Sequence, residues 1–429
     1  MGRKIKKLCF AIILVTLLTG LTGCYDAREV DDLAYPMAIG FDKGEDNLLK
    51  MTLQLALPVN IAGGEGGVGG EGDASSIVTL EVPAIYSGLN MANTFISKQI
   101  NLSHAKAIVF SEELARDGID KYVTAISRGR EFRPSTFVVI ATGSAEEYIR
   151  AVEPALEGNP AKYYEMKMRA FEYTGFTADT RFLKFYNNLK CTSSQGYVAL
   201  ASISDFEKSD EIDNEKSTYI EKGREVPLEG DFKAGGMPKT GDVKSEIMGL
   251  AVFDGAKMVG VLDGAETMSH LMVKGDFNYA FSTLPDPLKE GHFVLLSMSQ
   301  GREPRNSVEL VNDTPNISVN VILEGDIQSI QSGINYEEKE NLKILEKSIE
   351  KFFEEEITRY LEKTIKVYGV DIVGFGQLMK RKFVAWDEWE DFNWLNKYKE
   401  STFDVNVDVK IRRPGIMLRT VQVPNSKEE

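Results

Sequence analysis

The sequence predicts an α+β protein of several domains, with mixed and antiparallel sheets that helices pack against. Short apolar runs with period-two alternation lie between segments whose apolar residues recur at helical spacing. The length of 429 residues is enough for two or three domains. A long amphipathic helix at 336–368 precedes an alternating strand at 403–411, so we expect this helix to lie on an antiparallel sheet.

The first residues have the pattern of an export signal that ends in a lipid-attachment cysteine. A basic start with Arg3 and Lys4 leads into an uncharged apolar run from Leu8 to Leu21, and Cys24 follows two small residues. The alternative is a short transmembrane helix, but the run is shorter than the ~20 residues that a span needs. We therefore expect residues 1–23 to be a signal peptide and Cys24 to carry a diacylglycerol anchor.

Charge and cysteine content limit the possible partners. The net charge of −15 repels nucleic acid and anionic headgroups, so membrane attachment must come from the lipid. Of the three cysteines, Cys9 leaves with the signal and Cys24 is acylated. Cys191 alone remains, so no intrachain disulfide is expected.

Residues 24–203 are predicted to form a mixed α/β domain, because strands and helices interleave along them. Ser111 and Ser144 are expected to cap helices, the latter in a capping box. Strands are expected at 33–44, 48–57, 77–82, 104–110, 134–141 and 197–201. Helices are expected at 84–100, 112–116, 119–128, 144–153 and 181–190.

A glycine-rich stretch at 62–73 contains a formal G-x-G-x-x-G match at 67–72. A nucleotide site would need a helix directly after the glycines, but a strand follows at 77–82. Acidic residues in the stretch would also repel a phosphate. We therefore interpret it as a surface loop and expect no nucleotide cofactor.

The second half is predicted to contain three further parts. Residues 204–245 are charged and glycine-rich, which favours a linker or exposed loop. A middle domain at 246–305 has a hairpin around Asp254-Gly255, and a C-terminal α+β domain covers 306–429.

The long helix 336–368 has one apolar stripe without a strict heptad, so we expect a core helix rather than a coiled coil. The stripe consists of Leu342, Leu345, Ile349, Phe352, Phe353, Ile357, Leu361 and Ile365. Four charged residues are expected on the solvent side: Lys343, Glu346, Lys347 and Glu350.

The sequence carries no motif of a known enzyme nucleophile, zinc site or Walker loop. His104, His270 and His292 lack metal-ligand spacing, and Cys191 is expected to be a buried small apolar residue. Three arginines could form an anion site, although a solvated turn is the simpler interpretation: Arg128, Arg130 and Arg133. We predict no catalytic, cofactor-binding or metal-binding residue.

An ordered set of segments resembles the Ger(x)C spore germination lipoproteins, the C subunits of GerA-type nutrient germinant receptors. One such segment is Leu21-Thr22-Gly23-Cys24-Tyr25-Asp26, although the family usually has Trp at the place of Tyr25. The other segments are 29–34, 38–42, 103–106, 111–119, 251–253, 258–262, 371–376 and 405–415.

The resemblance implies mixed α/β domains at the outer face of the spore's inner membrane. It also implies action beside the membrane-embedded A and B subunits of the receptor, without enzymatic activity. We therefore expect a non-catalytic, membrane-anchored receptor subunit that is needed for nutrient-triggered germination. Two rivals stay open: a substrate-capture lipoprotein of a transporter, which would need a cleft between two lobes, and an envelope hydrolase, which would need a nucleophile or metal set.

Overall fold

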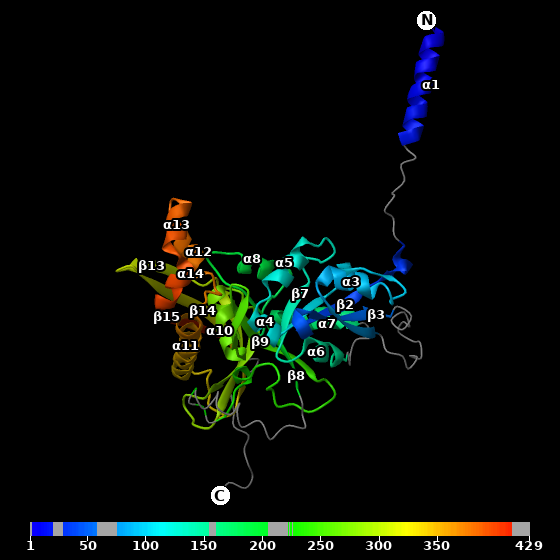
Figure 1. Ribbon diagram of the computed structural model, residues 1–429. Helices are drawn as coiled ribbons and strands as arrows, with labels where there is room; N and C mark the ends of the chain where they lie inside the picture. Colours follow the sequence, from blue (N-terminus) through cyan, green and yellow to red (C-terminus); the bar gives the residue numbers. More distant parts are fainter. Residues whose placement is uncertain are drawn as a thin grey trace.

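The computed structural model describes residues 2–19, 29–57, 75–153, 160–204, 222, 224 and 226–413. An eight-stranded sheet and a five-stranded sheet dominate it, with helices packed against both (Figure 1). The predicted α+β class is confirmed. Among the described residues, no helix has both the length and the apolar character needed to cross a bilayer, and this includes α1 (Gly2–Thr19).

The large sheet has the strand order β10-β9-β8-β7-β6-β2-β3-β4. Its four central strands, β2, β6, β7 and β8, run parallel, and an antiparallel hairpin extends each side. The strands are β2 Pro36–Lys43, β3 Leu49–Ala56, β4 Ser75–Val82, β6 Ala107–Ser111, β7 Phe137–Ala141, β8 Tyr197–Ile203, β9 Ser245–Asp254 and β10 Lys257–Leu262. The predicted hairpin around Asp254-Gly255 is present as β9 and β10. A short parallel pair, β1 (Leu33–Ala34) with β5 (Gln99–Ile100), lies outside this sheet.

Helices cover both faces of the large sheet, because successive apolar side chains of a strand such as β6 point to opposite faces and both need to be buried. Ile108 and Phe110 face one apolar cluster with α3, α4, α5 and α8, whereas Ala107 and Val109 face the other with α6 and α7. The helices are α3 Ile85–Ala92, α4 Glu112–Asp117, α5 Asp120–Arg128, α6 Ala145–Arg150, α7 Pro160–Met168 and α8 Phe182–Leu189. Helix α3 ends earlier than the predicted 84–100.

The end of β2 fixes the position of α6. A Cβ atom at Gly40 would lie 2.8 Å from the Ile149 side chain, so glycine permits this close approach. The N–H groups of Ala145 and Glu146 donate to the Asp42 carboxylate at 2.7 and 2.9 Å. Of the capping box predicted at Ser144, the described structure contains the first half, since the Ser144 hydroxyl accepts from the Glu147 N–H at 3.4 Å. Two acceptors therefore satisfy the start of this short helix.

The smaller sheet has β11, β12, β14 and β13 in antiparallel order, and β15 lies parallel to β14. The strands are β11 Tyr279–Pro285, β12 Phe293–Arg302, β13 Ser307–Val311, β14 Thr314–Ile330 and β15 Thr402–Arg413. The helices are α10 Gly264–Lys274, α11 Lys339–Glu362, α12 Phe375–Lys380, α13 Trp386–Phe392 and α14 Trp394–Lys397. A π-helical turn at Lys363–Tyr368 extends α11, so the predicted helix 336–368 is confirmed except for its first residues.

The solvent-side prediction for Glu346 is wrong, because this residue is 8% exposed. Its carboxylate accepts from the Ile411 N–H of β15 at 3.0 Å, while Glu350 and Glu354 accept from the Val409 and Val407 N–H groups at 3.3 and 3.2 Å. Four helical residues rise about 6 Å and two strand residues about 6.6 Å, so the two spacings match. The three glutamates thus occupy the outer edge of β15.

The apolar stripe of α11 is a core element, and Phe353 is 3% exposed. We expect Phe353→Ala to lower the free energy of unfolding by roughly 3–5 kcal/mol, because it leaves a cavity that neighbouring side chains fill only in part. The control is Ile344→Ala on the exposed side of the same helix, expected within about 0.5 kcal/mol of wild type. Urea-induced unfolding of the full chain measures both. Equal effects of the two substitutions would contradict a core role for the stripe.

Two expectations for the second half need correction or restatement. The exposed-loop prediction for 204–245 is wrong for its later part, where Leu228, Asp231 and Ala234 are buried. Within the predicted middle domain 246–305, β9 and β10 belong to the large sheet and β11 and β12 to the smaller one. The exact domain boundaries stay a prediction. The glycine-rich stretch at 62–73 lies outside the described residues.

Candidate functional site

Several buried polar and charged groups meet at the junction between the two sheets. One apolar cluster joins Tyr197, Leu250 and Leu262 of the large sheet to α10, α11 and the smaller sheet. Tyr368, just after α11, also reaches β10, where its hydroxyl donates to the Val261 carbonyl at 2.9 Å. A Cβ atom at Gly260 would lie 2.2 Å from the Tyr368 ring, so this position needs glycine. The two regions therefore share a closed, packed boundary.

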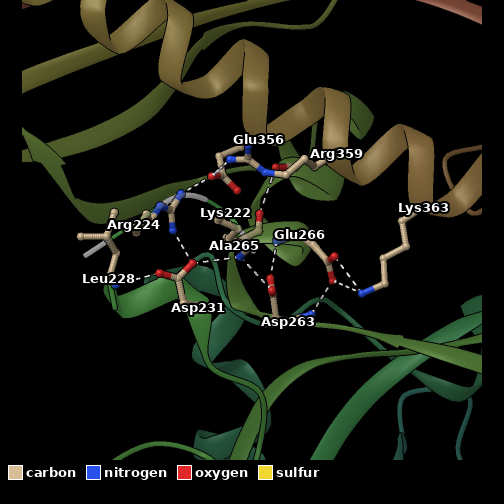
Figure 2. Close-up of polar contacts among 11 residues, drawn as sticks. Lys222, Arg224, Leu228, Asp231, Asp263, Ala265, Glu266, Glu356, Arg359 and Lys363 are labelled. Atoms are coloured by element: carbon tan, nitrogen blue, oxygen red, sulfur yellow. Dashed lines mark hydrogen bonds and ion pairs between the residues drawn. The ribbon is translucent and has the colours of Figure 1, made fainter. Parts of the chain in front are cut away.

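An ion cluster, buried except for the partly exposed Arg359 and Lys363, lies on this boundary and brings together Lys222, Arg224 and Asp231 with the start of α10 and the end of α11 (Figure 2). We call it the junction cluster; its cations are Lys222, Arg224, Arg359 and Lys363, and its carboxylates are Asp231, Asp263, Glu266 and Glu356. Four cations face four carboxylates, so the cluster is neutral overall. Burial of such charges is tolerated only when each is paired and hydrogen-bonded.

Asp231 is at the centre of one half of the junction cluster. Its carboxylate accepts from Lys222 Nζ at 2.9 Å, from Arg224, and from the Leu228 N–H at 2.8 Å. Arg224 also pairs with Glu356 of α11, and Lys222 reaches Asp263 at 2.9 Å. These contacts connect the segment predicted as a linker to both helices.

The other half of the junction cluster caps α10. Asp263 and Glu266 form a capping box, in which the Glu266 N–H donates to Asp263 at 2.8 Å and the Asp263 N–H donates to Glu266 at 2.8 Å. Lys363 donates to both Glu266 oxygens at 2.8 and 2.7 Å. Sequence reasoning missed this box, although the D-x-x-E pattern at 263–266 was a usable signal.

Charge neighbours shift the pKa values in the junction cluster in opposite directions. Burial alone would lower the pKa of Lys222, but the Asp263 and Asp231 carboxylates outweigh it and raise that pKa. Burial alone would raise the pKa of Asp231, but Lys222 and Arg224 lower it. The pKa of Glu266 is raised by burial and by Asp263, against the opposing effect of Lys363. Since each acid has a cation beside it, the cluster is suited to holding elements together rather than to transferring protons.

Asp371, in the segment 371–376 that carries part of the resemblance, makes a second buried contact across the junction. Its carboxylate accepts from the N–H groups of Gly374, Phe375 and Gly376 at 2.7, 3.1 and 2.8 Å. The Trp394 indole N–H donates to it at 2.9 Å. Its backbone exchanges hydrogen bonds with Gln195, each at 2.7 Å. Burial raises the pKa of Asp371, although these hydrogen bonds oppose the shift.

The three histidines have separate roles. His270 is fully buried and contacts the Tyr360 hydroxyl through Nδ1 at 2.8 Å, and burial together with Lys274 lowers its pKa well below the usual range. His104 stacks edge-on against Tyr35, and the His292 ring contacts the Glu290 carbonyl at 3.0 Å. Within the ranges that the structure covers, no three His, Cys, Asp or Glu residues are placed to hold a metal ion.

One serine–lysine pair was not foreseen. Lys167 Nζ lies 2.6 Å from Ser245 Oγ and 2.7 Å from the Ser245 carbonyl, and burial with the nearby Lys239 lowers the pKa of Lys167 to about 7. A lysine of this kind can activate a serine nucleophile. Here, however, Ser245 is 4% exposed within strand β9, which leaves little surface for a substrate. The pair therefore connects α7 to strand β9 of the large sheet.

The remaining residues singled out in the sequence have different outcomes. Cys191 is half-buried and lies 3.1 Å from the Ser193 hydroxyl, so the expectation of a buried apolar thiol is wrong. Arg128, Arg130 and Arg133 are all exposed, and of the three only Arg133 lines the cavity described below. Cys24 lies outside the described residues.

The architecture and the closed junction define a two-region α+β protein, and comparison with known proteins identifies its class. Residues 26–203 match the family model described as spore germination protein N-terminal domain. Residues 248–415 match the model described as spore germination B3/GerAC like, C-terminal. The chain belongs to this GerAC-like family of spore germination proteins.

Individual relatives agree with this assignment over nearly the whole chain. Spore germination protein KC of Bacillus subtilis (strain 168) is 28% identical over 424 residues, covering 96% of this chain and 97% of that protein. Spore germination protein B3 of the same strain is 21% identical over 417 residues, covering 93% and 96%. The crystal structure of the GerBC protein has a TM-score of 0.53 at 17% identity, covering 87% of this chain and 96% of that one, and it supports the fold.

Proposed function

We propose that this chain is a lipid-anchored, non-catalytic subunit of a spore nutrient germinant receptor. The observation that carries the proposal is the extent of the family match: it begins at residue 26, two residues after the expected lipid cysteine, and continues to residue 415 in two blocks. The folded part would be held outside the cytoplasm at the spore's inner membrane by acyl chains on Cys24. It would dock on the membrane-embedded A and B subunits.

The junction supports a docking role over substrate capture. A capture lipoprotein holds its ligand in a cleft between two lobes that move relative to each other. In this chain the two regions share an apolar cluster, the junction cluster and the hydrogen bonds between Asp371 and Gln195, so movement would break buried contacts. A rigid body that presents fixed surfaces to neighbouring subunits fits these contacts better.

Cys24→Ala tests the anchor. We expect the variant to incorporate no labelled fatty acid, because lipid attachment requires the thiol, and to germinate poorly because the tether no longer concentrates the protein beside its partners. Cys9→Ala is the matched control, since it removes a thiol from the leader but should leave labelling and germination unchanged. Both variants are compared with wild type at equal abundance in a deletion strain. Label on the Cys24→Ala chain, or normal germination without label, would contradict the proposal.

A further inference from the structure

A cavity of about 330 Å³ opens beside the amino ends of β6 and β7, within the size range of small-ligand sites. Four cationic side chains line it: Lys106, Arg133, Arg169 and Arg181. Two hydroxyl-bearing residues, Ser103 and Ser135, and the imidazole of His104 also line it. A concentration of basic groups is unexpected in a chain whose net charge is −15.

Ion pairs account for three of the four cationic side chains that line the cavity. Lys106 Nζ bonds Glu165 at 2.6 Å, Arg169 bonds both oxygens of Glu172 at 2.9 and 3.0 Å, and Arg181 bonds Asp179. Arg133 has no ion-pair partner in the part of the chain that the structure describes. Burial, Arg133 and Lys106 together lower the pKa of His104, so near neutral pH its ring adds a neutral hydrogen-bonding group rather than another charge. The uncompensated charge in this cavity is therefore the Arg133 guanidinium.

From these groups we infer that the cavity binds a phosphate group through Arg133. A guanidinium presents paired N–H donors that match phosphate oxygens, and hydroxyl groups beside it supply further donors. The lining carboxylates do not oppose the anion strongly, because Glu165 and Glu172 each face a cation at hydrogen-bond distance. A bound phosphate group would neutralise the charge of Arg133, which has no carboxylate partner among the described residues of the cavity wall.

The position of the cavity allows two sources of phosphate. The Tyr35 ring lies 4.6 Å from that of His104, so the chain enters the folded region beside the cavity. The eleven residue-to-residue steps from Cys24 to Tyr35 reach at most about 40 Å. A lipid headgroup is within that reach if the proposed anchor at Cys24 is correct, whereas free phosphate requires no anchor.

The test is isothermal titration calorimetry of the full chain in neutral detergent micelles with inorganic phosphate. We expect saturable binding to wild type, at least tenfold weaker binding to Arg133→Ala, and an intermediate loss in Arg133→Lys, which keeps the charge without the planar donors. Arg130→Ala is the matched control: like Arg133 it is an exposed arginine of this loop, but it does not line the cavity, and the affinity of the variant should stay within twofold of wild type. Unchanged thermal midpoints check that the variants fold.

Micelles doped with phosphatidylglycerol or with phosphatidylcholine then identify the source. If phosphatidylglycerol weakens the binding of inorganic phosphate and phosphatidylcholine does not, the cavity is a site for a lipid headgroup. If neither lipid weakens it, the cavity is a site for free phosphate. The inference is overturned if wild type shows no saturable binding, if Arg130→Ala weakens binding as much as Arg133→Ala, or if succinate binds as tightly as phosphate. Fatty-acid labelling at Cys24 can fail without affecting the lipid-free titration, so the two proposals fail separately.

Discussion

Asp371→Ala is expected to destabilise the protein by about 4 kcal/mol or more. The substitution leaves four N–H donors without their acceptor: the part-buried one of Gly374 and the buried ones of Phe375, Gly376 and Trp394. Each buried donor that loses its partner costs roughly 1–3 kcal/mol, out of a total stability of about 5–15 kcal/mol. Asp371→Asn should also be strongly destabilising, because its amide would point two N–H donors at groups that are themselves donors.

Tryptophan fluorescence reports unfolding close to Asp371. Trp394 donates a hydrogen bond to its carboxylate, and the other two tryptophans of the chain are Trp386 and Trp389. Urea-induced unfolding followed by this signal should show the midpoint falling in both Asp371 variants. The matched control is Asp387→Ala, which removes an exposed aspartate from α13 nearby and should change stability by less than about 0.5 kcal/mol. A loss below about 1 kcal/mol in Asp371→Ala would show that water replaces the carboxylate.

Asp231→Ala should cost roughly 3–5 kcal/mol, because it leaves Lys222 and Arg224 as buried cations without their shared carboxylate. The control is Glu355→Ala, which breaks the exposed pair with Lys351 and should cost under about 1 kcal/mol. Denaturant unfolding at neutral pH measures both variants. Similar small losses in the two would mean that the junction cluster contributes little to stability.

The same carboxylate predicts an acid dependence. Its pKa is lowered in the folded state, so its stabilisation is complete above the unfolded pKa of about 3.9 and is lost as the pH falls through the folded pKa. Wild type should therefore lose stability over this acidic range more steeply than Asp231→Asn. Parallel curves of unfolding free energy against pH for the two proteins would be inconsistent with this linkage.

Local patterns in the sequence predicted most elements, because alternation and capping act within a few residues. Examples are the hairpin around Asp254-Gly255, the caps at Ser111 and Ser144, and the stripe of α11 through Phe353. The error at Glu346 has a physical reason: a charged residue in a helix normally faces water, and nothing near it in the sequence indicates that β15 offers it an N–H group.

Long-range polar contacts could not be predicted in this way. Arg224 lies in a charged, glycine-rich segment whose composition favours a loop, and its partner Glu356 is 132 residues away. Lys167 and Ser245 are separated by 78 residues, so their contact had no local signal either. Arg133 was noted as part of a possible anion site, but its two neighbours in that hypothesis, Arg128 and Arg130, do not line the cavity.

The strand order of the large sheet has a consequence for how the chain folds while it is being made. Strand β8 ends at residue 203, but its neighbour β9 and the edge strand β10 are complete only at residue 262. At about 5–20 residues per second, these roughly 60 residues take about 3–12 s to synthesise. During that interval β8 would present unpaired N–H and C=O groups at an open edge, which invites pairing with other chains. A product truncated near residue 203 should therefore aggregate even though it contains helices α3 to α8, which pack against the sheet's two faces.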